Sequence, residues 1–143
     1  MEQRLSLMTL AVADMARARA FYETGLGWKP VFTTDDVAFY QMNGLIFGLY
    51  LRSEMAKDGH FRDDGATYSG MAMAYNARSE AEVDDIFATA QKAGAHIQKP
   101  PQKVNWGGYS GYFLDPDGHP WEVAYNPFWT ITKDGHMIIP PQN

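Results

Sequence analysis

The chain has 143 residues, of which 45% are hydrophobic and 20% are charged, and its net charge is -5. These values are typical of one globular domain over residues 1–143, because two ordinary domains need a longer chain. No apolar run approaches the ~20 residues of a membrane span, no Lys/Arg cluster favours a nucleic-acid partner, and the lack of cysteine excludes thiol chemistry. We therefore expect a cytoplasmic protein that binds neither a membrane nor a nucleic acid.

The first half of the chain predicts a strand, a helix and three more strands. Residues 5–12 are the first strand, and a helix over 14–27 begins with Asp14 as its N-cap. Gly25 or Gly27 ends this helix. Its apolar stripe consists of Met15, Ala18, Tyr22 and Leu26. The three strands that follow are expected over 28–34, 36–42 and 45–51, and Asn43-Gly44 predicts a tight hairpin between the last two.

The second half predicts the same order of elements. A strand over 68–75 precedes a helix over 79–94, in which Ser79 and Glu82 have the spacing of a capping box and Gly94 is the end. The buried face of this helix is expected to consist of Val83, Ile86, Phe87 and Ala90. Strands are then expected over 95–100, 107–115 and 120–126, with a three-residue turn, Pro116-Asp117-Gly118, between the last two.

The chain therefore contains one βαβββ unit written twice. Module one covers about 4–52, a polar linker covers 53–67, module two covers about 68–127, and a tail covers 128–143. The linker is either a mobile lid or a plain connection. The spacing from Gly44 to Gly48 recurs from Gly118 to Glu122, which indicates an internal duplication.

Two stretches, LAVADMARARAFYETGLGWK (10–29) and GYFLDPDGHPWEVAYNP (111–127), resemble the vicinal-oxygen-chelate superfamily. This superfamily includes glyoxalase I, extradiol dioxygenases, fosfomycin-resistance enzymes and bleomycin-resistance proteins. The resemblance implies an α+β fold in which two tandem βαβββ modules form a curved, glyoxalase-like sheet around a central pocket. It also implies a homodimer, and it leaves the reaction open because the superfamily hosts many.

Metal-dependent members of this superfamily place ligands at four equivalent strand positions, which correspond here to Leu7, Gly48, Gly70 and Glu122. Only Glu122 can bind a metal, whereas a catalytic divalent site needs about three protein ligands. His119 lies three residues from Glu122, and an odd separation along a strand points two side chains to opposite faces. The other histidines, at 60, 96 and 136, have no suitably spaced partner. We therefore predict no metal and no other cofactor, with a divalent metal as the alternative.

Hairpin register predicts which side chains face the pocket. Across the two turns, Phe39 opposes Gly48 and Tyr112 opposes Glu122. The predicted ligand-binding set is Leu7, Thr9, Phe39, Ile46, Gly48, Tyr50, Gly70, Ala72, Trp106, Ser110, Tyr112 and Glu122. Small residues ringed by aromatic ones suit an apolar or aromatic small molecule. The glycines could instead let the sheet bend or pack closely, and Trp106 could be a stacking surface or a core plug.

Three functions remain open on these residues. The first is a metal-free binding protein for a small apolar, aromatic or cationic molecule, with Glu122 as an isolated polar group in the pocket. The second is a divalent-metal lyase or dioxygenase of the glyoxalase type. The third is a metal-independent enzyme in which Glu122 is the general base and Tyr112 assists, since a carboxyl among aromatic residues has a raised pKa. We favour the first.

Overall fold

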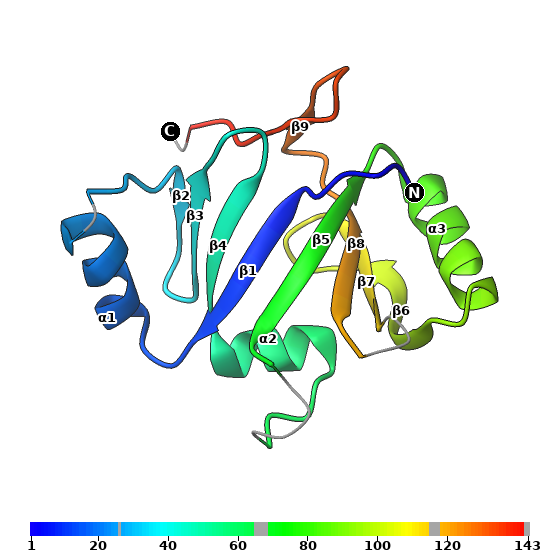
Figure 1. Cartoon of the computed structure of the whole chain (residues 1–143), viewed down its shortest axis with the longest axis horizontal. Coiled ribbons are helices and arrows are strands. Elements are labelled where there is room, and N and C mark those ends of the chain that lie inside the picture. Colours follow the sequence, from blue (N-terminus) through cyan, green and yellow to red (C-terminus); the bar gives the residue numbers. More distant parts are fainter. Residues whose placement is uncertain (26, 65–68, 115–117, 142–143) are drawn as a thin grey trace.

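The computed structural model describes residues 1–25, 27–64, 69–114 and 118–141. Its main feature is an eight-stranded curved sheet with strand order β2-β3-β4-β1-β5-β8-β7-β6 (Figure 1). The helices flank it, with α1 at one side and α3 at the other. None of the helices in the described ranges is both long and apolar enough to cross a membrane.

Each half of the sheet contains four strands. In the first half these are β1 (Leu7–Val12), β2 (Phe32–Thr33), β3 (Val37–Gln41) and β4 (Ile46–Leu51). In the second half they are β5 (Met71–Ala77), β6 (His96–Lys103), β7 (Tyr109–Leu114) and β8 (Pro120–Tyr125). Strands β1 and β4 pair in parallel, as do β5 and β8, and the antiparallel pair β1–β5 joins the halves. The predicted α+β fold of two βαβββ modules is confirmed.

The predicted hairpin registers are confirmed as well. Phe39 pairs with Gly48, and Tyr112 pairs with Glu122. Gly44 has a φ of 85°, which its turn requires and which other residues rarely adopt. The expected turn residues Pro116 and Asp117 lie outside the described residues.

Helix α3 (Glu80–Lys92) follows its sequence pattern closely. The Ser79 Oγ accepts a hydrogen bond from the Glu82 N–H at 3.1 Å, as in a capping box. The Glu82 carboxylate accepts instead from the Arg78 N–H and from the Tyr75 hydroxyl. The helix packs its buried residues, Val83, Ile86 and Phe87, against β5, β7 and β8.

The helix expected over 14–27 is α-helical only in α1 (Met15–Arg19) and continues as a π-helical turn, η1 (Ala20–Gly25). Asp14 is the N-cap, because its carboxylate accepts a hydrogen bond from the Arg17 N–H at 2.9 Å. In η1 the Glu23 carboxylate pairs with Arg19 at 2.7 Å and accepts from the Tyr40 hydroxyl. Leu26, expected in the stripe, lies outside the described residues.

The segment expected as a linker contains a helix, α2 (Arg52–Gly59), that runs directly on from β4. Met55 and Ala56 of this helix are buried against Ala72 and Tyr112. Residues 65–68, the end of that segment and the start of the expected strand, lie outside the described part of the chain. The polar composition of 53–67 concealed these few buried positions, which fix α2 against the sheet.

The tail forms a small hairpin, β9 (Thr130–Ile131) with β10 (Met137–Ile138), that returns to the first module. Gln41 holds it, since its Nε2 donates to the Met137 carbonyl at 3.0 Å and its Oε1 accepts from the Ile139 N–H at 3.2 Å. Met137 and Ile139 are buried beside Leu7 and Ile46. The tail is therefore part of the core of module one.

Met137→Ala is expected to lower the free energy of unfolding by about 2–5 kcal/mol, because the side chain is fully buried and its loss leaves a cavity. The matched control is Ile138→Ala, at the next position of β10, whose side chain is exposed. We expect this control to stay within about 0.5 kcal/mol of the natural protein. Urea unfolding measures both, and equal losses would show that the tail does not contribute to the core as described.

Candidate functional site

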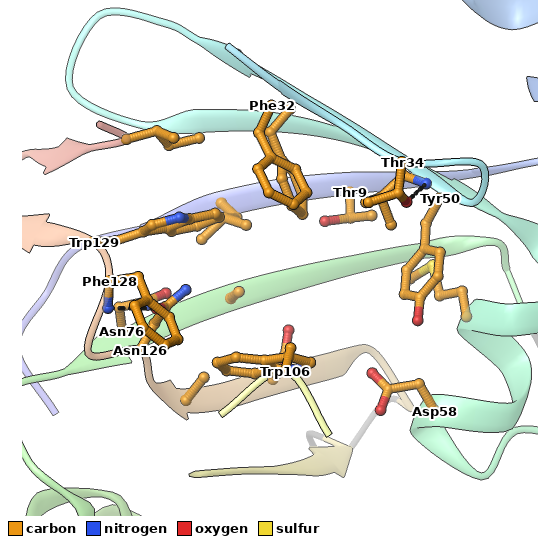
Figure 2. Close-up of a pocket in the computed structure, with 18 of the residues that line it drawn as sticks. Thr9, Phe32, Thr34, Tyr50, Asp58, Asn76, Trp106, Asn126, Phe128 and Trp129 are labelled. Atoms are coloured by element: carbon orange, nitrogen blue, oxygen red, sulfur yellow. Dashed lines mark hydrogen bonds between the residues drawn. The ribbon is translucent and has the colours of Figure 1, made fainter. Parts of the chain in front are cut away.

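A cavity of about 650 Å³ lies on the concave side of the sheet (Figure 2). Its walls come from both halves of the sheet, from α2, from the loop between β6 and β7, and from the tail. Seven aromatic side chains line it: Phe32, Phe39, Tyr50, Trp106, Tyr112, Phe128 and Trp129. The ring of Trp129 meets Phe39 edge to face, with centroids 5.1 Å apart. The cavity is therefore mostly apolar, with flat walls.

Of the twelve residues predicted to bind a ligand, eight line this cavity. They are Leu7, Thr9, Phe39, Tyr50, Ala72, Trp106, Tyr112 and Glu122. The other four, Ile46, Gly48, Gly70 and Ser110, do not. Ile46 is fully buried in the core beneath the tail, and Ser110 is fully buried on β7.

The two glycines have structural roles. A Cβ on Gly48 would lie 3.0 Å from the Thr9 Oγ1 and 3.1 Å from the Phe39 ring, so the missing side chain lets these two residues pack over the strand. Gly70 precedes β5 with a φ of 76°, and its carbonyl accepts a hydrogen bond from the Ala11 N–H. Gly70 therefore supplies a backbone conformation at the entry to the sheet. Close packing, rather than open volume, explains Gly48.

Trp106, in the loop between β6 and β7, lines the cavity and is 40% exposed. A Cβ on Gly108 would overlap the Trp106 ring, at 1.8 Å, so this glycine makes room for the indole. The loop is closed by two backbone hydrogen bonds between Val104 and residues 107 and 108. Trp106 is therefore a cavity wall that solvent also reaches, and the core-plug interpretation does not hold.

One end of the cavity carries acidic and phenolic groups from four elements. Asp58 of α2 is the centre of this acidic end. One carboxylate oxygen, Oδ1, accepts from the Lys99 Nζ at 2.8 Å, and the other, Oδ2, accepts from the Tyr112 hydroxyl at 3.0 Å. Lys99 comes from β6 and is only 3% exposed. This ion pair fixes α2 over the end of the sheet.

Glu122 belongs to the same end, on β8 beside Tyr112. Burial raises the pKa of its carboxyl to about 8, and the Asp58 carboxylate adds to the rise. The charge of Lys99 and the hydroxyls of Ser110 and Tyr112 act in the opposite direction. The Ser110 hydroxyl lowers the pKa of Glu122 because it lies close to the carboxyl, although it makes no hydrogen bond of ordinary geometry to any described residue. At neutral pH Glu122 is therefore mostly protonated, although its side chain still reaches the cavity.

The phenols at this end remain protonated. Burial raises the pKa of both Tyr50 and Tyr112 well above the usual value, and the Asp58 and Glu122 carboxylates add to the effect. Tyr50 faces the cavity and can donate a hydrogen bond to a ligand. The hydroxyl proton of Tyr112 is directed to Asp58, so Tyr112 orients the acidic end.

Neither Asp58 nor Lys99 was predicted from the sequence to belong to the site. Asp58 follows Met55 by three residues on one helix, a spacing that could have revealed a buried side on α2. Lys99 lies in an edge strand where register shifts on both sides of it break the alternation of faces. The contribution of the tail to the cavity was also missed, although its aromatic residues are a usable signal.

The residues around Glu122 do not fit a divalent metal. Its neighbour across the β5–β8 ladder is Ala74, and the neighbour of Ala74 on β1 is Leu7, so alkyl groups stand where further ligands would be needed. Within the described ranges no three His, Asp or Glu side chains come together as a metal site. The acidic end holds an ammonium group, Lys99 Nζ, between strand and helix instead.

Comparisons with known proteins agree with this fold. The family model for the Glyoxalase/Bleomycin resistance protein/Dioxygenase superfamily matches residues 4–123. A protein named metallothiol transferase FosB, from Lysinibacillus sphaericus (strain C3-41), is 27% identical over 120 residues, which cover 84% of this chain and 80% of that protein.

Many solved structures resemble this chain, and two of them are described below. One is a glyoxalase-related enzyme from Fulvimarina pelagi, with 36% identity and a TM-score of 0.50, over 96% of this chain and 99% of that one. The other is the Mn(II)-bound glyoxalase from Novosphingobium aromaticivorans, with 20% identity and a TM-score of 0.55, over 98% of this chain and 41% of that one. The second likeness concerns the fold alone.

The carboxyl of Glu122 is expected to titrate near pH 8 in the folded protein. Because this pKa exceeds that of the unfolded chain, the folded state holds a proton that the unfolded state loses. Stability should therefore fall as pH rises from about 4.5 to about 8. Asp58→Asn should lower the pKa of Glu122 by removing a like charge, and Lys99→Met should raise it further.

Carbon-13 NMR of labelled glutamate measures this titration, with the Glu122→Gln spectrum to assign the signal. The control is Asp84→Asn, which removes a carboxylate that bonds Tyr109 on the far side of module two and should leave the titration unchanged. A Glu122 signal that titrates in the ordinary range near 4.5 would contradict the burial of this group.

Proposed function

We propose a function from one established premise: this chain belongs to the Glyoxalase/Bleomycin resistance protein/Dioxygenase superfamily, whose family model matches residues 4–123. The proposed function is the metal-independent binding of a small, flat aromatic molecule. Cations with such rings are included in this class. The protein holds the molecule between the sheet and Trp106, with Glu122 as the polar group at one end.

The observation that carries this proposal is the composition of the cavity. Its volume of about 650 Å³ falls within the range of small-molecule sites, and its mostly apolar walls include seven aromatic side chains. Trp106 lines the cavity together with the small residues Ala72 and Ala74 of β5. A flat ring that stacks on the indole can use the space that these small side chains leave.

Binding without a metal is supported by what surrounds Glu122. Leu7 and Ala74 offer it no second or third ligand, and the fixed positive charge near the two carboxylates is that of Lys99. The names of the relatives, a metallothiol transferase and a Mn(II)-bound glyoxalase, describe metal chemistry in those proteins. We propose that this chain keeps their fold and one ligand position without the metal.

Glu122 then selects its ligand by charge. At neutral pH it is mostly a neutral acid, which donates a hydrogen bond to an uncharged acceptor such as a ring nitrogen or a carbonyl. Once ionised it pairs with a cation, and in a cavity with apolar walls such a pair is stronger than in water. One residue therefore serves an aromatic or a cationic ligand, depending on pH.

A second candidate is a metal-independent enzyme of the superfamily in which Glu122 is the general base. The observation in its favour is the pKa of about 8, since a base works best when its pKa lies near the working pH. Tyr112, proposed as its assistant, would act by orienting Asp58, because its hydroxyl donates to that carboxylate. A homodimer and a cytoplasmic location remain predictions from the sequence.

The pair acridine and 10-methylacridinium tests the proposed function, since the two rings are alike and only the second carries a fixed charge. Between about pH 7 and about pH 9, affinity for 10-methylacridinium should rise about tenfold, as expected if only ionised Glu122, with its pKa of about 8, binds the cation. Affinity for acridine should not rise, and Glu122→Gln should abolish the rise for the cation. Isothermal calorimetry measures each constant.

Trp106→Ala should lower the affinity for both compounds about tenfold, because the ligand ring loses a stacking surface. Trp121→Phe is the control, because Trp121 packs on Phe113 outside this cavity and should leave both affinities unchanged. Absence of binding for both compounds, or equal affinities in Trp106→Ala and the natural protein, would overturn the proposal.

A further inference from the structure

The cavity has a second polar end, which no prediction anticipated. Along β8 the residues that face the cavity are Glu122, Ala124 and, just past the strand, Asn126. Along the neighbouring strand β5, the cavity-facing residues end in Asn76, which follows Ala74 on the same face. Figure 2 shows Asn76 and Asn126 together, at the opposite end of the cavity from Asp58 and Tyr50.

The distance between the two ends follows from strand geometry. Asn126 is four positions after Glu122, and a strand rises about 3.3 Å per residue, so the Cα atoms of the two residues stand about 13 Å apart. The floor between them consists of alanine. A ligand that reaches both ends is therefore an elongated aromatic molecule with a polar group at each end.

Asn76 is the stronger indication that the second end binds something. The residue is only 3% exposed and lines the cavity, yet its side-chain amide makes no hydrogen bond to any residue in the described ranges. Its backbone N–H and carbonyl are both paired. Among the described residues the Asn76 amide atoms are not fully buried, so the amide reaches the cavity and can bond a ligand with matching groups.

Asn126 offers the complementary half of the same end. Its Oδ1 accepts a hydrogen bond from the Phe128 N–H at 2.9 Å, which fixes the side chain and leaves the amide nitrogen as the group it can offer a ligand. Asn126 therefore offers a ligand its amide NH₂ as a donor, and Asn76 offers both its amide NH₂ as a donor and its Oδ1 as an acceptor. Neither residue carries a charge, so this end suits an uncharged group.

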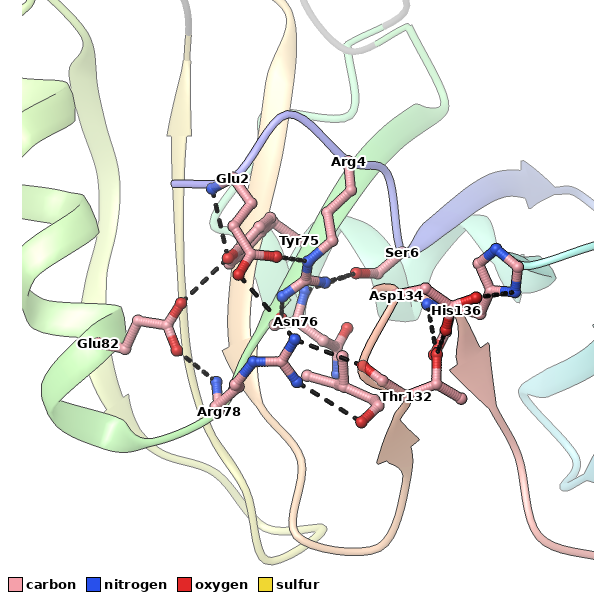
Figure 3. A network of polar contacts seen from close by, with 11 residues as sticks. Glu2, Arg4, Ser6, Tyr75, Asn76, Arg78, Glu82, Thr132, Asp134 and His136 are labelled. Atoms are coloured by element: carbon pink, nitrogen blue, oxygen red, sulfur yellow. Dashed lines mark hydrogen bonds and ion pairs between the residues drawn. The ribbon is translucent and has the colours of Figure 1, made fainter.

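Asn76 is held rigidly from behind, as Figure 3 shows. The Arg4 guanidinium donates through Nη2 to the Asn76 carbonyl at 2.6 Å and through Nη1 to the Ser6 Oγ at 3.1 Å. The same Oγ accepts from the Asn76 N–H at 2.8 Å. Arg4 also pairs with Glu2 at 2.6 Å and lies 4.0 Å over the Tyr75 ring. This support fixes the backbone of residue 76 and so the point at which its side chain leaves the strand.

We propose that Asn76 and Asn126 form an amide-recognition subsite, which selects aromatic ligands that carry an uncharged carboxamide or lactam edge. Such an edge presents a carbonyl acceptor next to an N–H donor. The acceptor meets the Asn126 amide nitrogen, and the donor meets the Asn76 side-chain oxygen. The proposal rests on the proposed function, since the aromatic walls hold the ring that carries this edge.

The test compares 2-naphthamide with 2-acetylnaphthalene, which has the same ring and shape but a methyl group in place of the amide NH₂. The natural protein should bind the amide about tenfold more tightly, as expected for one or two added hydrogen bonds. Asn76→Leu should remove this preference and leave affinity for the ketone within about twofold, since the backbone contacts of residue 76 persist. Isothermal calorimetry measures both compounds.

Gln102→Leu is the control, because it removes an exposed amide from β6 outside the cavity and should leave the preference intact. Equal affinities for the amide and the ketone in the natural protein, or a preference that survives in Asn76→Leu, overturn the subsite while the proposed function stands. If neither naphthalene binds, the proposed function fails and the subsite fails with it.

Discussion

Burial of the Glu122 carboxyl is the constraint on which the rest of the site depends. An ionised carboxylate in an apolar cavity is strongly unfavourable unless a cation compensates it. In a metal-dependent relative the ion would do this, whereas here Glu122 keeps its proton up to about pH 8. Asp58 contributes to that rise, and Asp58 is itself neutralised by Lys99 at 2.8 Å. The arrangement of α2, β6 and β8 therefore places protonated Glu122 at the cavity beside an Asp58 that is paired with Lys99.

The cavity spans both halves of the sheet, which meet at the β1–β5 pair. It has an acidic end, an amide end and an apolar region between them. Helix α2 closes the acidic end, the Arg4 network supports the amide end, and the tail adds Trp129 above Phe39. Each of these parts is held by contacts between segments far apart in the chain. A ligand that fits the cavity therefore contacts parts of the protein that depend on one another for their positions.

Local patterns predicted the parts of the structure that depend on neighbouring residues. The Asn43-Gly44 turn fixed the register of Phe39 with Gly48, and Ser79 fixed the start of α3. Positions that depend on distant contacts were not predictable in this way. Asp58 gains its role only when α2 packs on Ala72, and β-bulges on β6 direct Lys99 inward against the expected alternation. Gly70 was predicted to face the pocket because it was assigned to a metal-ligand position on the first strand of module two. In the structure it precedes that strand, β5.

The most direct test of the central claim is the metal content of untagged protein purified without chelators. Nickel, zinc, manganese and iron are quantified per chain by mass spectrometry, before and after incubation with each ion. We predict no stoichiometric metal, because Leu7 and Ala74 leave Glu122 without the further ligands that a divalent ion needs. About one ion per chain, lost in Glu122→Gln, would contradict the account and return the protein to the metal-dependent members of its superfamily.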